Sequence, residues 1–237
     1  MASDKPESVK HIAASAGIDG AAVTGNVLVK LAGATVHGDQ IITMGSHGNI
    51  GTTVATAAAP LQLDVDIPVQ PGKSLEVYGC LAGGDSGSPE LGVSVTFSDK
   101  SGSHRYVTRQ GLTATADAYS TLSTENGTTA VNDHITQGSM IDQVIFAVGY
   151  GGTTQEPMVV YGRIQGVGGC IQGNEHVFAG PSFLVSDGTL ADGYVCGPMV
   201  FDVEIPCTPG TVRVSAVCSA ATATIDPECA MTLAYRV

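Results

Sequence analysis

This sequence contains no tryptophan, and aromatic residues make up only 5% of its 237 residues. Charged residues are also scarce, at 14% against about 25% in an average globular chain. The ten lysines and arginines are scattered singly, and the net charge is −12. Because nucleic-acid binding depends on basic groups that neutralise phosphates, the composition argues against direct binding to DNA or RNA.

Several motifs of metal and nucleotide sites are missing as well. The six cysteines are at least 11 residues apart, which excludes zinc sites built on Cys-x-x-Cys. The six histidines never occur at His-x-His or His-x₃-His spacing, which argues against a zinc centre and against a cupin. Gly-x₄-Gly-Lys-Ser/Thr does not occur either. The sequence therefore predicts no cofactor and no metal site built on these motifs.

The first 20 residues lack a long apolar run, so the sequence predicts neither a signal peptide nor a transmembrane span. It predicts a short helix there instead. Pro6 suits a first helical turn, and Gly17 suits a helix end. The apolar positions at helical spacing are Val9, Ile12, Ala13 and Ala16. Residues 1–23 are accordingly expected to form an N-terminal helix or arm.

Glycine is abundant, with 31 residues, and it occurs with much valine, threonine and alanine. This composition is typical of short strands joined by tight turns. The chain also contains an internal repeat, because "LQLDVDIPVQPG" at 61–72 matches "MVFDVEIPCTPG" at 199–210. The same offset of 138 places Pro89-Glu90 on Pro227-Glu228.

Upstream of these matches, "KLAGATVHGD" at 30–39 resembles "RIQGVGGCIQGN" at 163–174. Residues of about 24–98 and 158–237 are thus predicted to be copies of one unit. Both copies alternate between apolar and polar residues, as a β-strand with one buried face does. In the first copy the apolar positions are Leu61, Leu63, Val65, Ile67 and Val69. In the second they are Met199, Phe201, Val203, Ile205 and Cys207, followed by Val212, Val214, Ala216 and Cys218.

The cysteines fit this pattern. Cys207 and Cys229 stand where the first copy has Val69 and Leu91, on the apolar face. We therefore expect these thiols to be small hydrophobic core residues, and one or two disulfides are the alternative. All six cysteines are Cys80, Cys170, Cys196, Cys207, Cys218 and Cys229.

The repeat predicts an all-β chain of two tandem antiparallel, jelly-roll-like β-sandwiches. Residues 24–155 are expected to form the first, including a Thr/Ser/Asn-rich excursion at about 112–139, and residues 156–237 the second. The second copy shows only about five strands. Three sources could supply the missing strands of the second sandwich: its own Gly-rich runs, residues 99–157, or a neighbouring subunit.

"GDSGSP" at 84–89 closely resembles the nucleophile motif of chymotrypsin-like serine proteases. In that family the chain order is His, Asp, Ser. The upstream histidines, His11, His37 and His47, lack the Ala-Ala-His-Cys setting of the catalytic histidine. The second copy has "TATID" at 222–226 in the same place. Ser86 is therefore predicted to lie in a polar turn, and no catalytic residue and no enzymatic activity are expected.

Two pairs of carboxylates occur at i, i+2 spacing, Asp64 with Asp66 and Asp202 with Glu204. This spacing puts both members of a pair on one face of a strand. Calcium takes six to eight oxygen ligands, so either pair would need help from loops to bind it. A solvated polar face and an ion site therefore both remain open for these four residues.

The chain resembles the double jelly-roll major capsid proteins of tailless icosahedral DNA viruses. The resemblance lies in the duplicated β unit, the short N-terminal helix, the long Thr/Gly-rich excursions and the lack of a signal peptide. The resemblance implies homotrimers whose six sandwiches form pseudo-hexagonal capsomers of a virion, synthesised in the host cytoplasm. It implies that residues 1–20 face other capsid proteins or an underlying membrane. Residues 112–139 would then be an exposed tower or intersubunit loop.

The alternative function is a tandem carbohydrate-binding or adhesin-type module, or a surface filament subunit. Lectin-like sandwiches stack sugars on exposed aromatic rings. The absence of tryptophan argues against this, as do the buried-phase positions of Phe97, Phe201 and Tyr235. The sequence therefore favours a self-assembling structural protein.

Overall fold

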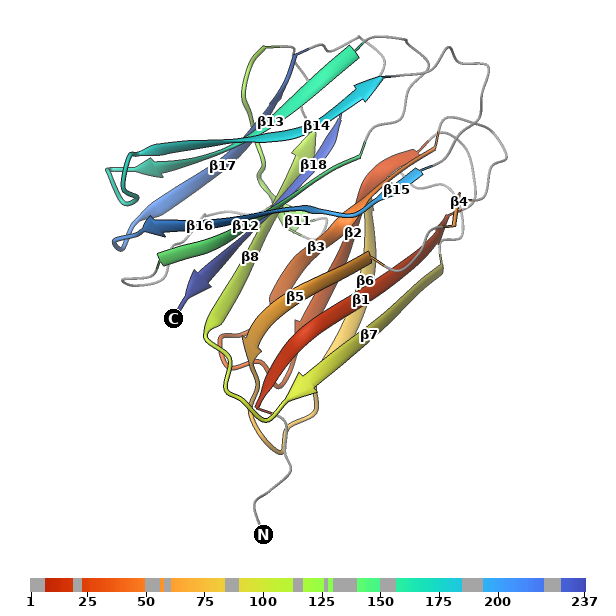
Figure 1. Ribbon diagram of the computed structural model, residues 1–237, viewed down its shortest axis with the longest axis vertical. Helices are drawn as coiled ribbons and strands as arrows, with labels where there is room; N and C mark the ends of the chain where they lie inside the picture. Colours follow the sequence, from red (N-terminus) through yellow and green to blue (C-terminus); the bar gives the residue numbers. More distant parts are fainter. Residues whose placement is uncertain are drawn as a thin grey trace.

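The computed structural model describes residues 7–18, 23–49, 56–57, 61–83, 90–112, 117–125, 128–129, 140–149, 157–184, 194–219 and 227–237. Every regular element in these ranges is a β-strand (Figure 1). Accordingly, none of the described residues forms a helix long and apolar enough to cross a membrane.

The strands form two units with a connecting group between them. The first unit contains β1 (Ser8–Ile18), β2 (Val23–Ala32), β3 (Gln40–Asn49), β4 (Thr56–Ala57), β5 (Leu61–Pro68), β6 (Glu76–Gly83) and β7 (Glu90–Ser98). The connecting group contains β8 (His104–Leu112), β9 (Ser120–Thr121), β10 (Thr124–Glu125) and β11 (Thr128–Thr129). The second unit contains β12 (Met140–Gly149), β13 (Pro157–Val167), β14 (Glu175–Leu184), β15 (Tyr194–Cys196), β16 (Met199–Pro206), β17 (Thr211–Cys218) and β18 (Glu228–Arg236).

The internal repeat is visible in the strand pairing. β1 pairs with β5 and β7, and its counterpart β12 pairs with β16 and β18. β2 pairs with β3 and β6, and β13 pairs with β14 and β17. Even the isolated bridges correspond, since Thr35 opposes Val69 and Ile171 opposes Cys207. The exception is β15, which pairs with β3 of the first unit, whereas β4 pairs with β1.

Four sheets follow one another through the molecule, and each unit contributes two of them (Figure 1). In the first unit, β5, β1 and β7 form the outer sheet, and β3, β2 and β6 form the inner sheet. In the second unit, β8, β18, β12 and β16 form the inner sheet, and β14, β13, β17 and β9 form the outer sheet. The two inner sheets pack face to face, so the sheet of β12 is internal although that of its counterpart β1 is external.

Each unit has its own hydrophobic core. The first-unit core contains the predicted face of β5, and Leu61, Leu63, Val65, Ile67 and Val69 are all buried. In the second unit, Ile205, Cys207 and the predicted face of β17 are buried, while Met199, Phe201 and Val203 pack at the margin. Strand alternation therefore predicted these core faces, because one face of an antiparallel sheet is buried against its neighbour.

A buried polar seam joins the inner sheets. The backbone N–H of Thr43 on β3 donates to the hydroxyl of Thr232 on β18 at 2.9 Å. That hydroxyl also lies 2.6 Å from the hydroxyl of Thr108 on β8, which donates to the carbonyl of Ile41. The side chain of Gln40 accepts a bond from the backbone N–H of Tyr106 at 2.7 Å. Because buried polar groups need partners, these bonds fix the packing of one unit on the other.

The predicted N-terminal helix is wrong, because residues 8–18 form β1. A bulge between Val9 and His11 adds a residue to the strand, so that Val9 and Ile12 both point into the core. The resulting spacing of three imitates one turn of a helix. The same bulge recurs in β12, between Ile141 and Gln143. An arm that faces a membrane or another protein through such a helix is therefore excluded for residues 8–18.

Strands from 99–157 complete the second sandwich. β8 pairs with β18 along nine residues, from Glu228 opposite Leu112 to Arg236 opposite His104. β12 lies on the other side of β18. The predicted excursion at 112–139 contains β9 to β11, and most of its remaining residues lie outside the described ranges.

Candidate functional site

A cleft of about 560 Å³ lies where the two units meet. It is lined by Asp64, Val65, Asp66, His104, Tyr106, Asp142, Gln143, Asp202, Val203, Glu204, Ala234 and Arg236. These residues belong to β5 of the first unit, to β12, β16 and β18 of the second, and to β8 between them.

Both predicted carboxylate pairs line this one cleft. Asp64 and Asp66 are on β5, and the equivalent Asp202 and Glu204 are on β16. The sequence placed each pair on the polar face of its strand. It had no means of predicting that the two faces share a cleft, because this depends on how the units stack.

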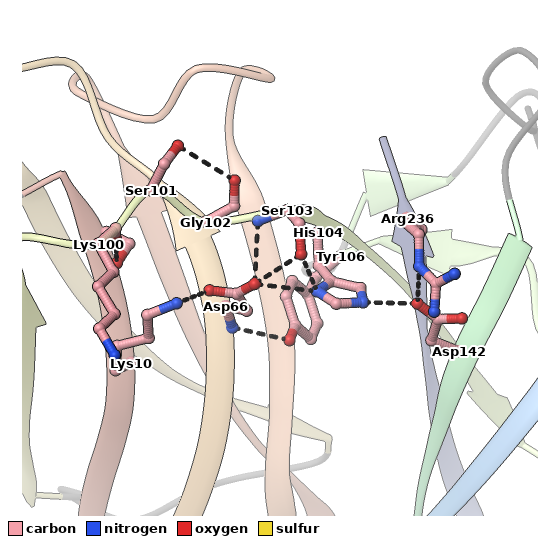
Figure 2. Close-up of polar contacts among 11 residues, drawn as sticks. Lys10, Asp66, Lys100, Ser101, Gly102, Ser103, His104, Tyr106, Asp142 and Arg236 are labelled. Atoms are coloured by element: carbon pink, nitrogen blue, oxygen red, sulfur yellow. Dashed lines mark hydrogen bonds and ion pairs between the residues drawn. The ribbon is translucent and has the colours of Figure 1, made fainter.

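A chain of polar contacts crosses the cleft from the first unit to the second (Figure 2). The hydroxyl of Ser103 donates to Oδ2 of Asp66 at 2.6 Å and lies 3.2 Å from Nδ1 of His104. Nε2 of His104 lies 2.8 Å from Oδ2 of Asp142 on β12. Nε of Arg236 donates to the same oxygen at 2.8 Å. His104 thus connects a carboxylate of each unit.

Both ring nitrogens of His104 face acceptors. Because Ser103 donates its proton to Asp66, its oxygen is available to accept a bond from Nδ1. Oδ2 of Asp66 also lies 3.4 Å from Nδ1. On the other side of the ring, Nε2 faces the carboxylate of Asp142. The imidazole of His104 therefore lies between a carboxylate of the first unit and a carboxylate of the second.

Asp66 is the first-unit anchor of this chain. Burial alone would raise the pKa of its carboxyl group. Hydrogen bonds from Lys10 and Ser103 outweigh burial, and they hold the pKa of Asp66 below its ordinary value. The backbone N–H of Ser103 also donates to this carboxylate, at 3.0 Å. Asp66 is therefore an ionised acceptor at neutral pH.

Gly102 allows the 99–103 loop to reach Asp66. A Cβ atom at this position would lie 2.5 Å from the backbone nitrogen of Pro68 and 2.6 Å from the carbonyl carbon of Ile67. Only glycine permits this approach of one backbone to another, and it is the approach that brings Ser103 to Asp66.

Tyr106 forms the back wall of the cleft. Its ring is 4% exposed and packs in the first-unit core, although β8 belongs to the sheet of the second unit. Its hydroxyl oxygen accepts a bond from the backbone N–H of Asp66 at 3.1 Å. Burial raises the pKa of Tyr106 well above its usual value, so the ring stays neutral. Tyr106 therefore adds a second tie between β8 and β5.

Asp64 and Asp202 in the cleft also have partners. Oδ1 of Asp64 lies 2.9 Å from Nδ1 of His11, and Oδ1 of Asp202 accepts a bond from Gln143 at 3.1 Å. Within the described part of the chain, no three His, Cys, Asp or Glu residues are grouped as metal ligands. These two contacts each connect neighbouring strands of one unit, whereas His104 connects Asp66 of the first unit with Asp142 of the second and makes the cleft a polar joint between the units.

The sequence did not identify the central residues of this joint. Ser103, His104, Asp142 and Arg236 form no local motif, because they are spread over more than 130 positions. The one signal was the expectation that residues 99–157 could add strands to the second sandwich. The predicted protease-like turn with Ser86 lies outside the described residues. Of the three histidines considered with it, His11 contacts Asp64, burial lowers the pKa of His37, and the side chain of His47 lies outside the described part.

The cysteines are placed as the repeat predicted. Cys170, Cys207, Cys218 and Cys229 are buried, and Cys80 is half-buried. Cys80, Cys170, Cys207 and Cys229 are free thiols. Burial raises the pKa of Cys207 to about 11 and that of Cys229 well above its usual value. These thiols therefore behave as core residues rather than as reactive groups. The side chain of Cys196, on β15, is outside the described part.

Comparison with known proteins gives little more. No family of known sequences matches this chain, and no curated protein matches it. The infectious bursal disease virus Gt strain structure aligns at 13% identity and a TM-score of 0.26, over 98% of this chain and 63% of the other. The VP2 subviral particle of the same virus aligns at 12% identity and a TM-score of 0.27, over 98% and 62%. T=1 particles derived from that virus align at 12% identity and a TM-score of 0.25, over 98% and 60%.

This chain thus spans about three fifths of the length of the solved chains that it resembles. TM-scores this low do not establish a shared fold. The strands of the chain itself establish an all-β architecture of two stacked antiparallel sandwiches.

Proposed function

We propose that this chain is a structural protein that assembles with copies of itself into a shell, as a capsid subunit of a virion. The observation that carries the proposal is the repeat of one sandwich, with the same pairing of its long strands, within a single chain. Two sandwiches that pack through their inner sheets make a two-lobed body. Such a body is suited to tiling a surface, because each lobe offers its own edges and loops to neighbouring copies.

The joint between the lobes supports this proposal. Thr43, Thr108 and Thr232 are buried between the inner sheets, and the Asp66–His104–Asp142 chain lies across the cleft. A shell subunit has to keep its two lobes in one fixed relation while neighbours bind to both. Buried hydrogen bonds between the lobes favour such a fixed relation, because their donors and acceptors meet in only one arrangement.

The finer form of the proposal is a homotrimer of double jelly-roll subunits. Three copies would place six sandwiches around an axis and give a pseudo-hexagonal capsomer. Other capsid proteins are the partners that such a capsomer would meet, and the virion is its location. Direct contact with the genome is not part of the proposal, because the net charge of −12 opposes it.

The proposal also includes the absence of enzymatic activity. At the centre of the cleft, Ser103, Asp66 and His104 already bond to one another or to Asp142 within the chain. A fluorophosphonate probe should therefore leave Ser86 and Ser103 unlabelled. Stoichiometric labelling of either serine would contradict this part of the proposal.

Size-exclusion chromatography with light scattering, followed by negative-stain imaging, tests the assembly. We expect trimers, or closed shells, whose abundance increases with protein concentration. A chain that stays monomeric at high concentration would overturn the proposal. Dimers without any larger assembly would contradict both the trimer and the shell, and shells built from another oligomer would support the coarser form.

Carbohydrate binding is the second candidate, and one observation favours it. Tyr119 and Tyr161 are 37% and 38% exposed, and the guanidinium of Arg163 lies 3.7 Å from the centre of the Tyr119 ring. Exposed tyrosines beside an arginine on an outer sheet are a possible platform for a sugar ring. A glycan array tests this role, and binding that is lost in Tyr161→Ala would favour it over the shell.

A further inference from the structure

β7 and β18 are equivalent strands with different surroundings. An offset of 138 residues places Glu90–Ser98 on Glu228–Arg236. β18 lies between β12 and β8, and β8 covers its second edge along nine residues. β7 pairs with β1 on one edge. Among the described residues no strand pairs with its other edge.

The open edge leaves the inner face of β7 incompletely covered. Leu91, Val93 and Val95 point toward the first-unit core but are only half-buried, and Phe97 is 44% exposed. Their counterparts Cys229, Met231, Leu233 and Tyr235 are all buried, and Tyr235 is 2% exposed. The apolar face is therefore fully buried in β18 of the second unit and only partly buried in β7 of the first.

This edge lacks the features that usually prevent edge-to-edge pairing. Soluble proteins protect long edge strands with lysine, proline or inward-pointing charges. The nine residues of β7, "ELGVSVTFS", contain no lysine and no proline, and their one charge is Glu90 at the start. A chain with a net charge of −12 repels its own copies, so a stretch with a single charge is where two copies approach at least cost.

The sequence of β7 is also complementary to itself. If two copies pair antiparallel about Ser94, Val93 lies opposite Val95 and Leu91 lies opposite Phe97. All four residues are on the core face, so the pairing extends the apolar layer across the contact. Glu90 then lies opposite Ser98, so no like charges oppose each other. The exposed Phe97 ring is covered by Leu91 of the second copy.

We propose that β7 is a self-pairing edge, at which two copies of this chain join their outer sheets through an antiparallel β7–β7 contact centred on Ser94. This inference goes beyond the proposed function, because the contact forms whether or not the chain builds a shell. Within a shell, it would be a twofold contact between neighbouring capsomers.

Cysteine cross-linking tests the register of the contact. Ser94→Cys puts two thiols opposite each other across the twofold axis, within the distance of about 4.4–6.8 Å between Cα atoms that a disulfide spans. Thr96→Cys is the matched control, because it is exposed on the same face of the same strand. In the proposed register, position 96 faces position 92, so its two copies are about 13 Å apart.

After mild oxidation, we expect a covalent dimer from Ser94→Cys on a non-reducing gel and no more than the wild-type background from Thr96→Cys. Peptide mass spectrometry identifies the bond that links the two substituted positions. Equal cross-linking of both variants, or of neither, would overturn the proposal.

A charge exchange tests the same contact without a covalent bond. Ser94→Glu and Ser94→Arg each place like charges on the axis, and each should weaken the dimer on the order of fivefold. A mixture of the two variants should restore it as a heterodimer in analytical ultracentrifugation. A mixture no tighter than either variant alone would overturn the proposal.

Light scattering on the same samples separates this inference from the proposed function. If the wild type forms trimers or shells but Ser94→Cys does not cross-link, the β7 contact is wrong and the shell proposal stands. If Ser94→Cys cross-links but the wild type stops at dimers, the β7 contact stands and the shell proposal fails.

Discussion

Thr43 on β3 donates its backbone N–H to the hydroxyl of Thr232 on β18 at 2.9 Å, although the two residues are 189 positions apart in the sequence. Both are fully buried, and each belongs to a different unit. The contact shows that the two copies of the repeat form one body, because a hydroxyl bonded on two sides within a packed interface leaves little freedom for sliding.

Replacement of Thr232 by valine removes this hydroxyl at nearly constant volume. The N–H of Thr43 and the hydroxyl of Thr108 then lose a partner inside the interface. We expect the free energy of unfolding to fall by about 1–3 kcal/mol, as measured by chemical denaturation. Thr211→Val, at an exposed site on β17, is the control and should change it by less than about 0.5 kcal/mol. Equal effects of the two variants would contradict the role of the seam.

Replacement of Asp66 by asparagine tests the joint across the cleft. The folded-state pKa of Asp66 is lowered, so its carboxylate stabilises the fold above the ordinary pKa, and this stability is lost as the pH falls through the folded-state value. Asp66→Asn should therefore cost about 1 kcal/mol at pH 7, and the difference from the wild type should shrink in acid.

Asp64→Asn is the matched control for Asp66. Asp64 lies two residues away on β5, its side chain is 94% exposed, and its contact with His11 is open to solvent. Exposed pairs of this kind contribute about 0–1 kcal/mol. Urea denaturation of both variants at several pH values compares them, and the prediction fails if Asp64→Asn is the more destabilising.

Replacement of Glu228 by glutamine tests the effect of a partly buried acid at the start of β18. Burial raises the pKa of Glu228 to about 7, so its contribution to stability is present below the ordinary pKa and is lost as the pH rises toward 7. Glu228→Gln should therefore raise the free energy of unfolding by about 2 kcal/mol at pH 8 and change it little at pH 4.

The repeat offers the control for this variant. Glu90 is the equivalent residue in the first unit and is exposed. Glu90→Gln should leave stability almost unchanged at either pH. Denaturation curves at pH 4 and pH 8 for both variants make the comparison, and a pH-independent gain from Glu228→Gln would rule out the titration of this carboxyl group as the cause.

Thiol labelling tests the structural role of the cysteines. Cys170, Cys207 and Cys229 are buried free thiols, and burial raises the pKa of the last two. In the native protein at pH 7.5, iodoacetamide should leave all three unlabelled, and in concentrated guanidinium it should label them. Peptide mass spectrometry measures both states. Rapid labelling of Cys207 in the folded protein would contradict its place in the core.

The sequence predicted those parts of the fold that depend on a local pattern. Alternation along β5 and β17 identified their buried faces, because a regular strand repeats every two residues. The offset of 138 identified the duplication. β1 was missed because its bulge interrupts that period, and the spacing between Val9 and Ile12 then resembles a helix.

The cleft could be predicted only in part, since its chemistry depends on distance in space. The carboxylates of β5 and β16 were recognised as surface pairs, but Asp142 and Arg236 contact each other from positions 94 residues apart. No local pattern encodes such a contact. It follows from the way one sandwich stacks on the other, and the buried threonines that determine this stacking look like ordinary strand residues in the sequence.

The order of the four sheets has a consequence for any assembly of this chain. Because the sheet of β1 is external and that of its counterpart β12 is internal, the two ends of the body are unlike. One end presents the polar face of β1, with Lys10 and His11, and the other presents Tyr161, Arg163 and Val177. A subunit with two different ends is polar along the axis that joins them. A closed layer of such objects, all oriented alike, has a chemically distinct interior and exterior without the aid of a second protein.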